Sequence, residues 1–148
     1  MHHLINCPYD DVLAQFPFLK EELSTAENVE NISPETYYSY DDIGLEFKVH
    51  DETNLIEMVV FYPFSKGFSV LHKVGKIPES INFGSSRAEI EKKLGEPAIF
   101  FEKEYDPLLG MQNPMSRYNF EFASLFIQFC GAEEKACEFR WAYPAKNS

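Results

Sequence analysis

The feature that most constrains the fold of this chain is a two-residue alternation of apolar and polar side chains. The pattern is clearest in Gly44–His50, where every second residue is apolar. Successive side chains of a β-strand point to opposite faces, so this segment predicts a strand with one buried face. The next run, Leu55–Tyr62, is almost continuously apolar and predicts a central strand covered on both faces. Pro63 ends that strand, because proline cannot donate to a sheet ladder.

The remaining strands are predicted from shorter aromatic or alternating segments. These segments are Tyr37–Tyr40, Phe68–Leu71, Ala98–Lys103, Arg117–Phe122, Ser124–Cys130 and Ala136–Tyr143. Between them, the polar stretch Ser24–Glu35 and the proline- and glycine-containing stretch Glu104–Met115 are predicted to be loops. Gly131–Lys135 has a workable length for a hairpin turn.

Two helices are predicted, and each carries a signal at one of its ends. Apolar residues recur at roughly helical spacing in Tyr9–Leu23, where Pro17 should kink the helix or split it in two. The second helix begins after Ser86, which has with Glu89 the S-x-x-E spacing of a capping box. Gly95 occupies the position at which a left-handed residue ends a helix. The start and stop signals therefore agree on one short helix.

Together these elements predict an α+β fold, in which helices pack on one face of an antiparallel sheet. The 148 residues, 45% of them hydrophobic, suffice for a single domain that spans 1–148. Each half of the chain, 1–74 and 75–148, offers a helix and then about four strands. Two similar halves are therefore a further expectation, although no residue-level repeat relates them.

Negative charge is concentrated in the first part of the chain. Residues 1–64 hold 13 acidic and two basic side chains, whereas residues 65–148 hold 11 of each, and the whole chain has a net charge of −11. A net acidic protein is poorly suited to displace phosphate counterions, so we expect no direct binding to nucleic acid. The acidic side chains are concentrated in three consecutive strands and their connections, where outward positions lie close together.

This pattern predicts an acidic face that docks a basic partner. A solvated surface that merely aids solubility is the alternative interpretation. Aromatic side chains would supply the desolvated anchors that charge alone does not provide. The predicted partner-binding residues are Asp41, Asp42, Glu46, Asp51, Glu52 and Glu57, with Tyr38 and Tyr40 as anchors.

The sequence carries no local signature of catalysis or of a bound cofactor. Its four histidines have no metal-binding spacing, and P-loop, Rossmann, EF-hand and nucleophile-elbow motifs are missing. We therefore expect no cofactor and no enzyme, with a small enzyme built from residues distant in sequence as an alternative. No run of about 18 apolar residues is present, which excludes a transmembrane helix. The sequence also has no signal-peptide pattern, so we expect a cytoplasmic protein without a membrane partner.

The three cysteines follow no metal-like spacing. Cys130 ends one predicted strand and Cys137 begins the next, so a cross-strand disulfide is geometrically conceivable. In a reducing compartment, however, buried reduced thiols are the expected state.

The segment Gly75–Pro97 resembles a known family. It contains FGSSRAEIEKKLGEP, which is similar to a signature of small bacterial immunity proteins in polymorphic toxin and contact-dependent growth inhibition systems. In a looser form the same segment resembles the helix of the outer-membrane lipoprotein and β-lactamase-inhibitory-protein group, whose members pack helices on an antiparallel sheet. The likeness describes a capped helix and its stop, so it implies a scaffold and identifies no binding residue.

The resemblance implies an immunity protein that binds and neutralises a cognate bacterial toxin domain. Combined with the acidic first half, it predicts a basic C-terminal toxin domain as the partner, and a nuclease in particular, because a nuclease carries positive charge to hold phosphates. Acidic and aromatic groups would cover the toxin's active site in a stoichiometric complex. The lipoprotein likeness implies a different function, that of a structural or assembly module.

Overall fold

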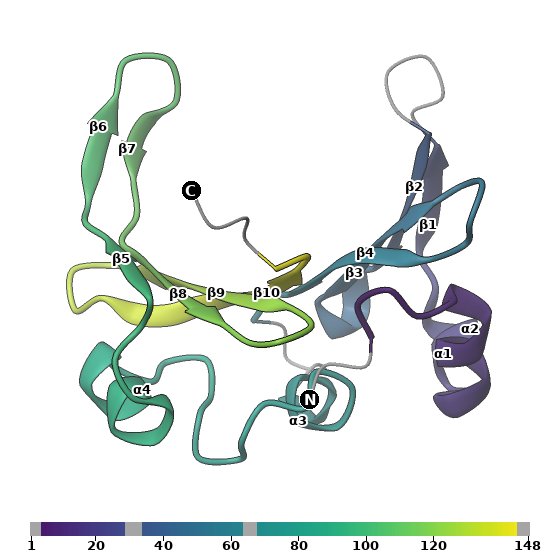
Figure 1. The fold of residues 1–148 in the computed structure, drawn as a ribbon, viewed down its shortest axis with the longest axis horizontal. Helices are drawn as coiled ribbons and strands as arrows, with labels where there is room; N and C mark the ends of the chain where they lie inside the picture. Colours follow the sequence, from purple (N-terminus) through teal and green to yellow (C-terminus); the bar gives the residue numbers. More distant parts are fainter. Residues whose placement is uncertain (1–3, 29–33, 64–67, 145–148) are drawn as a thin grey trace.

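The computed structural model describes residues 4–28, 34–63 and 68–144. One eight-stranded antiparallel sheet dominates the molecule, with the strand order β1-β2-β3-β4-β10-β9-β8-β5. Figure 1 shows that this sheet is curved and that the helices lie on its convex side. A small separate sheet, formed by β6 and β7, rises from one end of the large sheet on the concave side (Figure 1).

The first four strands are neighbours in sequence and in space. They are β1 (Thr25–Asn28), β2 (Glu35–Tyr40), β3 (Leu45–His50) and β4 (Ile56–Phe61). The alternation predicted for β3 is confirmed, because its three apolar side chains are buried and the three between them are not. The predicted loop at Ser24–Glu35 is wrong for β1, whose backbone pairs with β2 although all four of its side chains are exposed. Residues 29–33 of that prediction lie outside the described residues.

The other half of the sheet comes from the second part of the chain. Its strands are β5 (Ile99–Phe101), β8 (Met115–Asn119), β9 (Ser124–Cys130) and β10 (Lys135–Ala142). Antiparallel pairing of β10 with β4, with Phe139 opposite Phe61, joins the two groups of strands into one continuous sheet. The predicted loop at Glu104–Met115 is wrong, because β6 (Glu104–Asp106) and β7 (Gly110–Gln112) form a hairpin within it.

The helices are short. They are α1 (Tyr9–Gln15), α2 (Leu19–Glu22), α3 (Phe68–Lys73), α4 (Arg87–Leu94) and the 3-10 helix η1 (Asp41–Ile43). Pro17 separates α1 from α2, as predicted. The capping box of α4 is also confirmed: Ser86 Oγ accepts from the Glu89 amide at 3.2 Å, and Glu89 Oε1 accepts from the Ser86 amide at 3.0 Å. The strand predicted at Phe68–Leu71 is wrong, because that segment begins α3.

The predicted α+β class with helices packed on one face is therefore corrected. Among the described residues, far more lie in strands than in helices, and one large antiparallel sheet accompanied by a few short helices describes the fold better. Two errors explain the difference. Proline limits the first helix to two short pieces. In addition, two segments that lack an alternating pattern, β1 and the β6–β7 hairpin, are strands. Among the described residues, no helix is both long enough and apolar enough to cross a membrane.

The core includes side chains from both parts of the chain that meet on the helical side of the sheet. Tyr9 of α1 stacks on Tyr38 with ring centroids 4.2 Å apart, and its hydroxyl is hydrogen-bonded to that of Tyr40. Trp141 of β10 donates from Nε1 to the carbonyl of Gly75, just after α3, at 3.2 Å. These contacts hold the helices on the convex side, and none of the helices in the described residues covers the concave side of the sheet (Figure 1).

Candidate partner-binding surface

The concave face of the sheet carries no helix in the part of the chain that the structure describes (Figure 1). Directly paired residues on neighbouring strands point to the same face, so the register shows which side chains lie there. One row of paired residues crosses five strands from β3 to β8: Glu46, Val60, Arg140, Phe126 and Arg117. We call the surface around this row the open face.

The charge of the open face changes along this row. At the β3 end of the row lies the carboxylate of Glu46. Toward the β8 end the row contains Arg140 of β10 and Arg117 of β8. Some of its carboxylates are paired with cations: Arg140 lies 3.5 Å from Glu138, and Lys48 lies 3.3 Å from Glu35. The acidic face predicted over three strands is therefore not one continuous patch.

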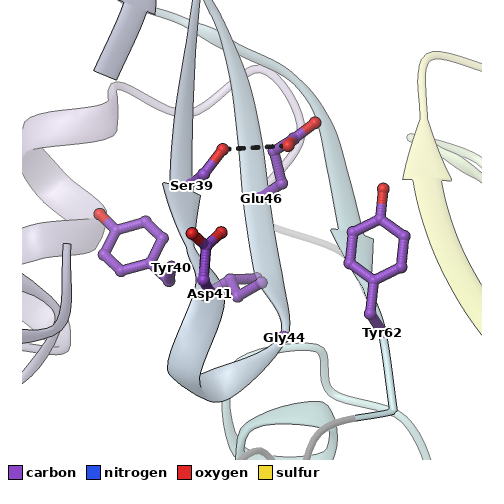
Figure 2. A pocket seen from close by; sticks show the side chains of 7 residues that line it. Ser39, Tyr40, Asp41, Gly44, Glu46 and Tyr62 are labelled. Atoms are coloured by element: carbon purple, nitrogen blue, oxygen red, sulfur yellow. Dashed lines mark hydrogen bonds between the residues drawn. The ribbon is translucent and has the colours of Figure 1, made fainter. Parts of the chain in front are cut away.

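An acidic notch of about 280 Å³ lies where β2 turns through η1 into β3. Gly44 makes this turn in the left-handed conformation (φ 64°), and its carbonyl accepts from the Tyr62 amide at 2.7 Å. The turn places Asp41 beside β3, where Ser39 Oγ donates to Glu46 Oε2 at 3.0 Å (Figure 2). None of the seven residues that line the notch is basic: Ser39, Tyr40, Asp41, Gly44, Leu45, Glu46 and Tyr62.

The chemistry of the acidic notch suits a cation. Burial raises the pKa of Tyr62, and the carboxylates of Glu46 and Glu138 raise it further, so the phenol stays protonated at neutral pH. Figure 2 shows its hydroxyl pointing to the same side as the Glu46 carboxylate. The notch thus presents two carboxylates and hydroxyl groups to solvent, and a lysine or arginine side chain of a partner is the complementary group.

The predicted acidic residues are not all brought together. Asp41 and Glu46 line the acidic notch, and Asp42 is exposed beside them on η1. Asp51 and Glu52 lie at the opposite end of β3, where the chain turns toward β4. The prediction of a single cluster therefore fails, because a six-residue strand is roughly 17 Å long.

Neither Asp51 nor Glu57 lines the acidic notch. The carboxylate of Asp51 accepts from Thr36 Oγ1 at 2.5 Å and from Asn28 Nδ2 at 2.9 Å, so it ties β1 and β2 to the end of β3. This role is structural. Glu57 lies in β4, half-buried, and its Oε1 atom is buried without a hydrogen-bond partner.

The two predicted aromatic anchors lie on the other face of the sheet. Tyr38 and Tyr40 pair with Phe47 and Leu45, whose side chains are buried on the helical side. Tyr40 is fully buried and Tyr38 is half-buried under Tyr9. Although Tyr40 is among the residues that line the acidic notch, neither tyrosine is an exposed anchor. The alternation along β2 explains this correction, since it places Ser39, between them, on the open face.

Cys130 and Cys137 form a disulfide, with their Cα atoms 5.8 Å apart. The expectation of reduced thiols at these positions is therefore wrong. The bond joins the end of β9 to the beginning of β10, the two strands that flank the Gly131–Lys135 turn. Among the residues with described positions, no group of three or more histidine, cysteine or acidic side chains is arranged to hold a metal ion.

Sequence reasoning missed the residues that complete the surface. Ser39 and Gly44 carried no signal of their own, because the notch arises only when η1 folds β2 back beside β3. Leu108 and Leu109 lie in Glu104–Met115, which the sequence predicts to be an exposed loop; both are exposed, but they form the tip of the β6–β7 hairpin. Two adjacent leucines between a proline and a glycine are a signal that could have identified an exposed apolar tip.

No protein-family model matches this chain. Two solved structures share its fold. An extracellular protein containing an SCP domain from Bacillus anthracis strain Ames has a TM-score of 0.60 and 14% identity, over 95% of this chain and 44% of that one. The DUF4309 family protein YjgB from Bacillus subtilis strain 168 has a TM-score of 0.52 and 13% identity, over 95% and 82% of the two chains. This chain thus spans less than half of the first protein, and at these identities the likeness concerns the fold alone.

Proposed function

We propose that this chain is an immunity protein that binds and neutralises a cognate bacterial toxin domain, a basic nuclease. The observation that carries the proposal is the acidic notch, in which Asp41 and Glu46 face solvent at the margin of an uncovered sheet face. The net charge of −11 and the resemblance of Gly75–Pro97 to immunity proteins support the same function. That segment forms the capped helix α4, which is scaffold and leaves the open face available.

The mechanism is stoichiometric occlusion, which requires no catalytic turnover. A nuclease uses lysine and arginine side chains to hold phosphates, and the carboxylates of Asp41 and Glu46 can receive such a side chain in place of a phosphate. Long-range attraction between the acidic protein and its basic partner accelerates their encounter, whereas close contacts determine how slowly they separate. The complex therefore blocks the toxin by covering its substrate groove.

The cytoplasm, where a nuclease meets its substrate, is the location that we propose for this complex. One observation favours a second candidate. The Cys130–Cys137 disulfide is typical of oxidising compartments, which suits a binding or assembly module outside the cytoplasm. Trapping of thiols in intact cells distinguishes the two candidates: reduced Cys130 and Cys137 would support the cytoplasm, whereas an intact disulfide would support the module outside it.

The test of function first asks whether the gene beside that of this chain encodes a large exported protein, and then uses the C-terminal domain of that protein. This domain is expressed with and without the immunity candidate, and cell survival and nuclease activity are measured. We expect inhibition that is complete at a molar ratio of one. Undiminished toxicity at a molar excess, or the lack of a neighbouring toxin gene, would overturn the proposal.

The role of the acidic notch is tested with two variants of equal charge change. Asp41→Lys/Glu46→Lys alters the notch, whereas Glu52→Lys/Glu121→Lys alters exposed positions at the opposite strand ends. At about 50 mM salt we expect the notch variant to associate with the toxin domain at least tenfold more slowly, and the control about twofold more slowly. Equal slowing by both variants would mean that net charge matters and the notch does not.

A further inference from the structure

The β6–β7 hairpin carries an unusual concentration of exposed apolar side chains. Nine large hydrophobic side chains are exposed in the described part of the chain, and six of them lie in Ile99–Met111. Leu108 is 94% exposed and Leu109 is 76% exposed, values that leave these side chains almost without contact to the rest of the protein. The remaining four are Ile99, Phe101, Tyr105 and Met111. Contiguous apolar exposure of this kind marks interaction sites.

The hairpin holds these side chains in a fixed arrangement. Its strands pair in register, with Tyr105 opposite Met111 on one side of the ribbon. At the tip, Asp106 Oδ1 accepts from the amides of Leu108 and Leu109 at 2.8 Å and 3.0 Å. Gly110 closes the turn with a left-handed φ of 82°. A tip that is ordered before binding loses little conformational entropy when a partner covers it.

The hairpin projects from the sheet on the side of the open face (Figure 1). At its base, the carbonyl of Pro114 accepts from the Phe129 amide at 2.9 Å, which ties the hairpin to β9. A cavity of about 290 Å³ lies where this base meets the sheet. Its lining includes Glu102, Gln112 and Arg140. The apolar tip does not fold back onto the core. It rises from the β5–β8 end of the sheet, across the open face from the acidic notch (Figure 1).

The charge around the tip selects the kind of partner. Residues 102–112 hold the acidic side chains Glu102, Glu104 and Asp106 but only one basic side chain, Lys103. Apolar loops that enter membranes are accompanied by basic residues, which attract anionic lipids, so an acidic hairpin is unsuited to that role. A second copy of this chain also carries a net charge of −11 and would be repelled. The partner that complements this hairpin is a protein with a basic surface, which attracts the acidic side chains, and an apolar recess in that surface, which accepts the exposed leucines.

We propose that the β6–β7 hairpin is the anchor that enters an apolar recess with basic walls on the toxin domain. This inference rests on the proposed function, and it assigns different roles in binding to the acidic notch and to the hairpin. The acidic notch governs the rate of encounter, and Leu108 and Leu109 govern the lifetime of the complex. Desolvated apolar anchors act mainly through the dissociation rate, whereas exposed charges act mainly through the association rate.

The test compares Leu108→Ser/Leu109→Ser with Leu23→Ser/Phe122→Ser, which removes two exposed apolar side chains elsewhere. The probe is the same toxin domain, rendered inactive, and surface plasmon resonance measures both rates. We expect the hairpin variant to dissociate about 100-fold faster with an association rate within twofold of the wild type. The control variant should match the wild type within twofold in both rates. Circular dichroism and thermal melting verify that each variant is folded.

The outcomes separate this inference from the proposed function. If the wild-type chain does not inhibit the toxin, the proposed function fails and the inference fails with it. If the wild-type chain inhibits and the hairpin variant dissociates at an unchanged rate, the inference alone is overturned. Binding to phosphatidylglycerol vesicles, or concentration-dependent dimerisation, that the hairpin variant abolishes would also overturn it by assigning the leucines to another occupant.

Discussion

Replacement of Gly75 by alanine tests how tightly the chain just after α3 packs against Phe61 in the centre of the sheet. A Cβ atom at this position would lie 2.5 Å from the carbonyl oxygen of Leu71 and 2.9 Å from Cζ of Phe61. Both residues are 1% exposed, so neither has room to move. The carbonyl of Gly75 also accepts the hydrogen bond from Trp141, which a shift of this backbone would weaken.

The expected loss of stability combines two effects. Overpacking of a filled core costs about 1–3 kcal/mol, and a weakened buried hydrogen bond costs about 1 kcal/mol. A total of about 3 kcal/mol lowers the melting temperature by roughly 9 °C in a domain of this size. Differential scanning calorimetry measures this shift directly. Gly131→Ala is the matched control: its Cβ would meet nothing within 4 Å, so only the strain of its left-handed φ of 81° remains, about 1 kcal/mol.

A double-mutant cycle separates the ring contact from the backbone contact. Phe61→Leu removes the ring atoms nearest Gly75 and leaves the Leu71 carbonyl in place. The double variant should therefore lose less stability than the two single variants together. A Gly75→Ala protein that melts within 2 °C of the wild type would refute the reasoning, because the end of α3 would then not be packed against β4.

Two further predictions concern titration and thiols. Burial raises the pKa of Tyr118 to about 12, so the unfolded chain releases this proton at a lower pH than the folded chain does, and stability should fall as the pH rises from about 10 to about 12. Denaturant titrations across this range should show a smaller fall for Tyr118→Phe, and an equal fall would contradict the assignment. Protein purified without reductant should show one reactive thiol per unfolded chain, that of Cys7, and three after reduction. Reduction should cost about 2.5 kcal/mol of stability for a bond between residues seven positions apart, and three thiols before reduction would exclude the Cys130–Cys137 bond.

The candidate site could be predicted only in part from the sequence. The sequence predicts Asp41 and Glu46 as partner-binding residues, and both line the acidic notch. Their separation from Asp51 and Glu52 depends on the direction and length of β3, which composition does not contain. Whether Tyr40 faces solvent or core depends on which side of the sheet α1 covers.

The sequence by itself determined the features whose physics is local. Apolar alternation specifies the buried side of β3, Pro17 removes a backbone donor and ends α1, and the reciprocal hydrogen bonds of Ser86 and Glu89 begin α4. Each of these signals acts within a few residues of chain.

Only the tertiary structure decided the features that depend on distant partners. β1 and the β6–β7 hairpin have no buried face and exist because their backbone groups pair with another strand. The segment Phe68–Lys73 is too short for a periodic pattern to distinguish helix from strand, and it forms α3 against the sheet. The acidic notch and the open face arise in the same way, because strand pairing brings together residues that no local pattern connects.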